Sequence, residues 1–153
     1  MTYDSTQDTM AHINRVRALL GAVTHDLRER AYNHDRSKLE SPEKEAFDAI
    51  TPRLAGVEYG SEEYRATMRE FKPAIQHHQL NNDHHPEYFG EEGIHGMNLV
   101  QLTEMLCDWK AAGERHDDGG DLYRSIEINQ QRFGYSDDFR RLLENTADWL
   151  EGK

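Results

Sequence analysis

Residues 12–27 read HINRVRALLGAVTHDL, and this stretch decides the fold class. Its large apolar side chains recur at alternating spacings of three and four residues, as one stripe along an α-helix requires; they are Ile13, Val16, Leu20, Val23 and Leu27. His12 falls on the margin of this stripe, and His25 falls nearly opposite to it. The pattern predicts a long first helix whose apolar side, with His12, faces the core while His25 faces solvent.

Further helices are predicted along the rest of the chain, over about residues 41–50, 61–75, 97–112, 122–133 and 137–150. Pro73 should kink or divide the segment that contains it. Residues 51–60 are expected to form a loop, and no convincing alternating strand pattern occurs. The sequence therefore predicts an all-α protein: a single domain over residues 1–153, built as a bundle of about six helices, with the C-terminal helices over about 122–150.

Core positions follow from the same periodicity. In the helix predicted over 97–112, five side chains are expected to face inward: Leu99, Leu102, Met105, Leu106 and Trp109. Trp149 is expected in the core as well, because large aromatic side chains contribute much of the buried apolar surface of a domain.

The charge balance restricts the partners. The 153 residues carry 18 Lys and Arg against 29 Asp and Glu, a formal net charge of -11. No nucleic-acid polymer is expected as a partner, because phosphate binding needs clustered cations. No apolar run approaches the roughly 20 residues that cross a bilayer, so no membrane partner is expected. The single cysteine, Cys107, fits a reducing cytoplasm, which would be the host cytoplasm if the protein is encoded by a phage.

Histidines and aspartates form the main functional signal. Nine histidines occur, and the metal-capable residues follow in the order His12, His34-Asp35, His78, His84-His85 and Asp108. Imidazole and carboxylate together suit a divalent Mn, Fe, Co, Ni or Zn ion. The adjacent pair His34-Asp35 can reach one ion only near a helix end or bend, since neighbours on a helix point about 100° apart.

This order resembles that of the HD superfamily of metal-dependent phosphohydrolases, which are all-α. Residues 34–38, HDRSK, resemble the His-Asp-x-x-Lys signature of its phosphodiesterase branch. The chain is also similar to short phage and bacterial proteins of uncharacterised function that combine the segments HINRV, HDRSK, HHQLNNDHHPEYF and EMLCDW. The resemblance covers about residues 10–112 and implies an HD-like fold with the metal site in that part.

The resemblance implies a ligand set for one ion, consisting of His12, His34, Asp35 and Asp108. His78 and either His84 or His85 match the additional histidines of branches that bind a second ion, and Asp35 would then bridge the two. The two middle histidines lie only six or seven positions apart here, closer than is usual in the superfamily. That spacing leaves open the number of ions, one or two, and the choice between His84 and His85.

The resemblance also implies the remaining roles. Asp35 and Lys38 are the expected catalytic residues, with Lys38 binding a substrate phosphate; Asn82 is expected at the substrate, and Glu87 and Glu104 are expected to orient histidine ligands. The implied activity is that of a nucleotidase or phosphodiesterase, in which a metal-activated water attacks a nucleotide or a similar phosphorylated small molecule.

Other interpretations stand beside these. The protein could be an HD-type di-iron oxygenase, or a non-catalytic phage protein that sequesters a nucleotide or second messenger; an oligomer is compatible with either. His12 could be a packed core residue, and His34-Asp35 a helix cap. Lys38 could be a surface lysine that pairs with Glu43 or Glu45.

Overall fold

The computed structural model describes residues 3–58, 60–115 and 121–153, and every regular element within these ranges is helical. The prediction of an all-α protein is confirmed. The chain forms two compact units, residues 1–34 and 35–153. None of the described helices is both long enough and apolar enough to cross a membrane.

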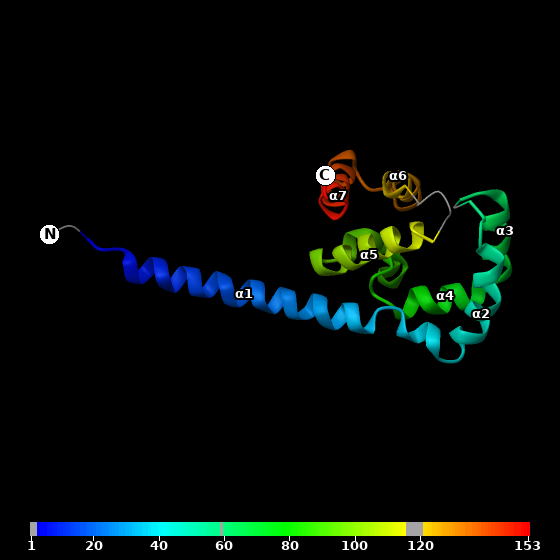
Figure 1. Cartoon of the computed structure of the whole chain (residues 1–153), viewed down its shortest axis with the longest axis horizontal. Helices are drawn as coiled ribbons and strands as arrows, with labels where there is room; N and C mark the ends of the chain where they lie inside the picture. The colour runs from blue at the N-terminus through cyan, green and yellow to red at the C-terminus, as the bar shows by residue number, and fades with distance from the viewer. Residues whose placement is uncertain (1–2, 59, 116–120) are drawn as a thin grey trace. The chain divides into compact units, whose positions relative to one another are not determined.

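The first unit is one long helix, α1 (Thr6–Asn33), drawn in blue in Figure 1. It has 28 residues and none of them is buried. The apolar stripe is exposed, with 39% of Val16 and 61% of Leu20 accessible, and His12 is exposed too. The predicted helix is confirmed. Within this unit its stripe and His12 are not buried, because a single helix has no second element of its own to cover them.

The second unit contains the remaining elements (Figure 1). In chain order they are η1 (Arg36–Leu39), α2 (Glu43–Leu54), α3 (Glu62–Glu70), α4 (Lys72–Asn81), η2 (Pro86–Gly96), α5 (Leu99–Gly113), α6 (Leu122–Phe133) and α7 (Asp137–Leu150), where η marks a 3-10 helix.

Proline explains one success and one error in the predicted boundaries. The segment expected over 61–75 is divided at Phe71, and Pro73 occupies the second position of α4, where a missing N–H costs no intrahelical hydrogen bond. The loop expected over 51–60 is wrong at its start, because α2 continues through Pro52 to Leu54. Pro52 lies in the last turn of α2, where the helix is about to end in any case.

The hydrophobic core of the second unit is formed by η2, α5, α6 and α7. Its buried members are Ile94, Met97, Leu102, Met105, Leu106, Leu122, Ile126, Tyr135, Leu143 and Ala147, with Trp109 among the side chains packed against them. Two core predictions are wrong, since Leu99 is 72% and Trp149 is 76% exposed. Trp149 lies two residues after the buried Ala147, so it points about 200° away around α7.

The start of α5 anchors the segment that carries the clustered histidines. Asn98 caps the helix by accepting hydrogen bonds from the N–H groups of Val100 and Gln101, and the Gln101 side chain accepts from the N–H of Asn98 in return. The amide of Gln101 also donates to Asp83 Oδ2 over 2.7 Å. Asp83 directly precedes His84, so this hydrogen bond ties the histidine segment to α5.

Candidate metal centre

Asp35 occupies the turn that follows α1. The helix ends at Asn33, and Asp35 has the left-handed backbone conformation, with φ of 57°. Asp tolerates this conformation better than most residues do. Its carbonyl oxygen then accepts the N–H of Lys38 over 2.9 Å and opens η1. The expectation that His34-Asp35 lies at a helix end is confirmed.

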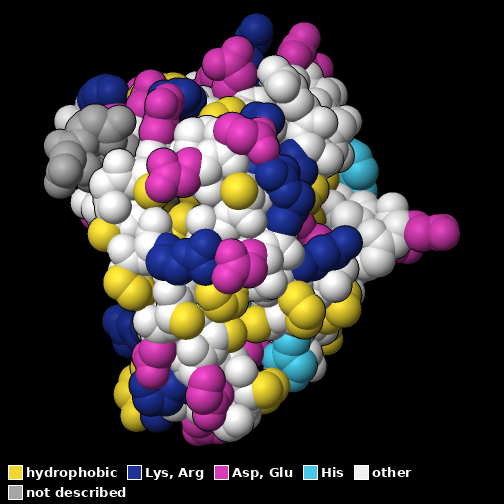
Figure 2. Space-filling view, turned by 90° about the vertical axis from the view of Figure 1, so that its right-hand side faces the viewer, with side chains coloured by type: hydrophobic (Ala, Val, Ile, Leu, Met, Phe, Trp, Pro, Cys, Tyr) yellow, Lys and Arg dark blue, Asp and Glu magenta, His cyan; other side chains and the backbone are white. Residues whose placement is uncertain are grey.

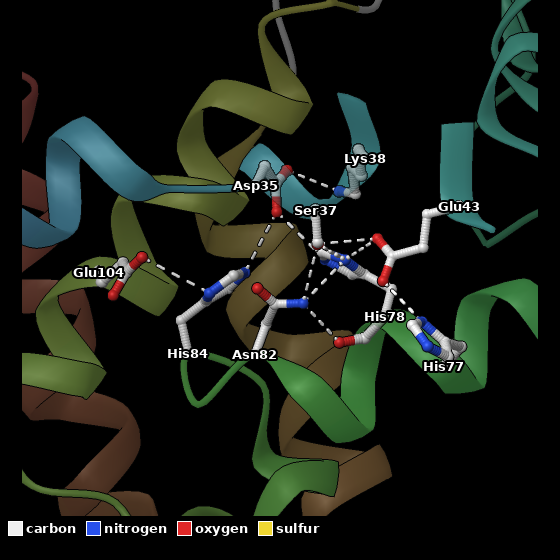
Figure 3. A network of polar contacts seen from close by, with 9 residues as sticks. All are labelled: Asp35, Ser37, Lys38, Glu43, His77, His78, Asn82, His84 and Glu104. Atoms are coloured by element: carbon white, nitrogen blue, oxygen red, sulfur yellow. Dashed lines mark hydrogen bonds and ion pairs between the residues drawn. The ribbon is translucent and has the colours of Figure 1, made fainter. Parts of the chain in front are cut away.

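Three histidines converge on Asp35 within the second unit. Asp35, His78, His84 and His85 each offer one ligand atom, and these four atoms lie within 4.8 Å of one another. Asp35 Oδ1 is 3.1 Å from His78 Nε2 and 3.5 Å from His84 Nε2, as Figure 3 shows. We call these four residues the histidine cluster. It includes both His84 and His85, between which the sequence does not decide.

Burial makes the cluster a sheltered site. His78 and His84 are each 3% exposed, and the ring centroids of His84 and His85 are 4.2 Å apart. His78 lies in α4, and the other two histidines follow this helix directly. His84 and His85 lie six and seven positions after His78, and the chain turns after α4, where the N–H of His85 donates to the carbonyl oxygen of Asn82 over 3.1 Å.

The protonation states suit metal binding. Burial, together with the neighbouring imidazoles of His84 and His78, lowers the pKa of His85 to about 3. Burial would raise the pKa of Asp35, but its contacts with His78, His84 and Lys38 outweigh burial and hold that pKa well below its usual range. At neutral pH, His85 is therefore a neutral imidazole and Asp35 is a carboxylate, the forms in which both residues bind metal ions.

Lys38 lies at the edge of the cluster. Its Nζ is 2.6 Å from Asp35 Oδ2 and 4.9 Å from the centre of the Phe47 ring. The alternative interpretation, in which Lys38 pairs with Glu43 or Glu45, is wrong, because Lys38 pairs with Asp35. In a 3-10 helix, side chains three positions apart lie on the same side, which brings Lys38 next to Asp35. The ammonium group is half-buried beside the cluster.

The other predicted residues occupy different places. A carboxylate oxygen of Asp108, in α5, lies within 4.8 Å of a carboxylate oxygen of Asp35. Glu104 Oε1 is 3.5 Å from His84 Nδ1. Glu87 instead pairs with Arg132 of α6, so its contact is with an arginine and not with a histidine of the cluster. His12 and His34 belong to the first unit, and their ligand roles stay predictions.

Asn82 supports the backbone near the cluster. Its side-chain amide donates to the carbonyl oxygen of His78 over 2.7 Å and to Ser37 Oγ over 3.2 Å. These contacts link the end of α4 to η1 (Figure 3). The expected contact of Asn82 with a substrate stays a prediction.

Glu43 is a site residue whose role the sequence does not reveal. The carboxylate is only 1% exposed, and it contacts Ser37, His77 and His78 at 2.8 Å each. In the sequence, Glu43 follows Pro42 at a helix start, where an acidic residue is expected for its interaction with the helix dipole. The pair His77-His78 could have indicated a buried carboxylate partner, but no spacing rule identifies which one.

The donors of the cluster fit a transition-metal ion. Three imidazole nitrogens and a carboxylate oxygen are a ligand set that Zn, Fe, Mn, Co and Ni accept. The Nε2 atoms of His78 and His85 are buried and make no hydrogen bond within the described residues. Buried nitrogens without such a bond are costly, and a bound cation would satisfy them.

The comparisons with known proteins define the family and add no function. A family model described as a family of unknown function (DUF5662) matches residues 1–152, so the chain belongs to that family. No curated protein matches the chain. No solved structure matches it either.

Proposed function

We propose that this protein is a metal-dependent phosphohydrolase that acts on a nucleotide or a related phosphorylated small molecule. One observation carries the proposal: a carboxylate and three imidazoles, from segments up to 50 residues apart, direct ligand atoms to within 4.8 Å of one another. The resemblance of the ligand order to that of the HD superfamily supports the reaction class. We propose that the site is HD-like. We also propose that the protein is located in the cytoplasm, where Cys107 stays reduced.

The proposed ligands fall into two sets, both of which include Asp35. Asp35, His78, His84 and His85 would hold one ion in the second unit. By resemblance, His12 and His34 would join Asp35 and Asp108 around an ion, so that Asp35 is shared if two ions are present. A bound ion of this kind activates water and offsets the negative charge of a phosphoryl group.

Residues of the chain prepare the site for an anion. The two oxygens of the Asp35 carboxylate contact different partners: Oδ1 faces the histidines, and Oδ2 faces Lys38. An ammonium group has three donors, and one of those of Lys38 contacts Asp35. The others can bind a phosphate oxygen, because a lysine is a compact cation on a flexible stem.

The surface charges favour a small substrate over a nucleic-acid polymer. Figure 2 shows Lys and Arg side chains interspersed with Asp and Glu side chains on the face drawn there. Many cations of the described residues are paired with carboxylates, as Arg53 is with Glu70 at 2.7 Å and Arg69 with Glu62 at 2.6 Å. A polymer would need an extended row of cations, whereas a small phosphate ester needs only Lys38 and the metal.

The experiment is metal analysis followed by a substrate panel. Purified protein is analysed for bound metal, reloaded separately with Mn, Fe, Co, Ni or Zn, and incubated with mono-, di-, tri- and cyclic nucleotides. The proposal predicts bound transition metal and the release of phosphate, or of a nucleotide product, from at least one class.

Two other results would replace the proposal by different functions. Two irons with a mixed-valence state and no hydrolysis would favour the oxygenase interpretation. Tight nucleotide binding without turnover under any metal would favour a sequestering protein. Absence of both metal and turnover would contradict the proposal itself.

A further inference from the structure

Glu43 is a buried carboxylate that contacts His78, a member of the histidine cluster. It is the first residue of α2, and its side chain is 1% exposed. Removing a carboxylate from water costs several kcal/mol unless hydrogen bonds compensate. The Ser37 hydroxyl donates to Oε2 over 2.8 Å, and Oε1 and Oε2 lie 2.8 Å from Nδ1 of His77 and of His78 respectively.

The contact with His78 fixes the direction of that imidazole. An ionised carboxylate only accepts hydrogen bonds, so the 2.8 Å contact with Glu43 places a proton on Nδ1 of His78. The Asn82 amide nitrogen is 3.1 Å from the same Nδ1, but its two N–H groups donate to Ser37 Oγ and to the His78 carbonyl oxygen. Nε2, on the opposite side of the ring, then points at Asp35 Oδ1, 3.1 Å away. Figure 3 shows the ring of His78 lying between the two carboxylates.

The second contact of Glu43 provides a natural control. His77 is the sequence neighbour of His78 and makes a contact of the same length with the same carboxylate. Its side chain is 46% exposed, however, and it is not part of the cluster. One carboxylate thus contacts two histidines, of which only His78 faces the cluster.

We propose that Glu43 is a positioning residue, which holds the imidazole of His78 by its Nδ1–H so that Nε2 is presented to a metal ion. The inference rests on the proposed function, because it assigns the partner of a proposed ligand. Carboxylates that orient ligating histidines in this way typically contribute 10- to 100-fold to metal affinity. The Ser37 hydroxyl, which donates to Oε2, helps the Glu43 carboxylate to stay buried.

The test compares Glu43→Gln with His77→Gln in the full-length chain. Zn²⁺ affinity is measured by competition with a chromophoric chelator. Glu43→Gln should bind Zn²⁺ roughly 10- to 100-fold more weakly than the wild type, while His77→Gln should stay within roughly twofold. Both variants should keep the helical circular dichroism of the wild type.

A second measurement separates positioning from a general loss of stability. Nitrogen-15 NMR locates the protons on histidine rings, and it should show a solvent-protected Nδ1–H on His78 in the wild type and in His77→Gln. This proton should exchange rapidly in Glu43→Gln. The wild-type spectrum tests the hydrogen bond even if Glu43→Gln does not fold.

The outcomes distinguish the two proposals. Equal Zn²⁺ affinity of Glu43→Gln and the wild type, or a His78 without a protected Nδ1–H, would overturn the role of Glu43 and leave the metal centre intact. A wild-type protein that binds no metal, while its His78 keeps the protected Nδ1–H, would refute the proposed function and with it the use of this geometry for metal binding.

Discussion

Lys38 Nζ lies 2.6 Å from Oδ2 of Asp35, the same carboxylate whose Oδ1 faces the histidine cluster. One side chain therefore joins a cation to a set of imidazoles. The pair is half-buried, and its two members are only three residues apart, because Asp35 directly precedes η1 and Lys38 lies within it. This arrangement places the ammonium group where a ligand bound at the cluster would meet it.

Lys38→Ala should preserve metal binding and impair catalysis. If Lys38 contacts a substrate phosphate, kcat/KM should fall by roughly 10- to 100-fold, the value of one or two charge-assisted contacts. Metal content, measured by elemental analysis, should equal that of the wild type. Lys44→Ala is the matched control, because Lys44 is exposed and pairs with Asp48. Equal kinetics of both variants on a confirmed substrate would exclude a substrate role for Lys38.

His85 should make the metal-free protein sensitive to mild acid. A histidine in an unfolded chain titrates near pH 6.5, and burial beside His84 and His78 lowers the pKa of His85 to about 3 in the fold. Between these values the unfolded chain binds more protons than the folded one. The stability gained from neutral His85 is therefore complete above about pH 6.5 and is lost as the pH falls toward 3.

The measurement is the melting temperature of metal-free protein between pH 7 and pH 4.5. His85→Gln should show a flatter dependence than the wild type, and the exposed His95→Gln should follow the wild type. The lowered pKa of Asp35 acts in the same direction, but only below its usual range near pH 4. Parallel curves for His85→Gln and the wild type would mean that His85 is not held neutral by the fold.

Gln101→Ala should weaken both the fold and the cluster. The change removes half of the capping box of α5 and the hydrogen bond to Asp83. A loss of about 1 kcal/mol is expected from such a cap, which lowers the melting temperature of a chain of this size by about 3 °C. Thr103→Ala, at an exposed position of the same helix, is the control. A Gln101→Ala protein with unchanged melting temperature and metal affinity would show that this hydrogen bond does not anchor His84.

The sequence predicts the helices well because their periodicity is local. The stripe from Ile13 to Leu27 predicts α1 without reference to the rest of the chain. Burial is less predictable, since it depends on which element packs against which. Leu99 and Trp149 are exposed because neither lies on the side of its helix that packs in the core; Trp149 points about 200° away from the buried Ala147.

The candidate site, too, has residues that the sequence indicates and a residue that only the structure identifies. The cluster of Asp35, His78, His84 and His85 consists of residues that the ligand order already indicates. The burial of Glu43 against His78 joins residues 35 positions apart, and its sequence signal is that of an ordinary acidic residue at a helix start. Contacts between distant segments are therefore where the structure adds most to the site.

His12→Ala and His25→Ala test the ligand role expected on α1. His12→Ala should lower metal affinity if His12 ligates as the resemblance implies, and His25→Ala should leave it unchanged. Because His12 is exposed in α1, neither change is expected to lower the melting temperature of the metal-free protein. Metal titration and melting curves of both variants provide the check. Loss of the metal from His25→Ala alone would show that the phase assigned to the helix is wrong.

Metal titration of the metal-free wild type and of Asp35→Ala tests the central claim most directly. Asp35 contributes an oxygen to the cluster and offsets the charge of the ion, so its removal should abolish tight binding. Asp48→Ala, an exposed carboxylate on α2, is the control. The account predicts uptake of one or two transition-metal ions per chain by the wild type and by Asp48→Ala, and none at the same concentration by Asp35→Ala, with all three proteins equally helical. Full metal occupancy of Asp35→Ala, or no uptake by the wild type, would contradict it.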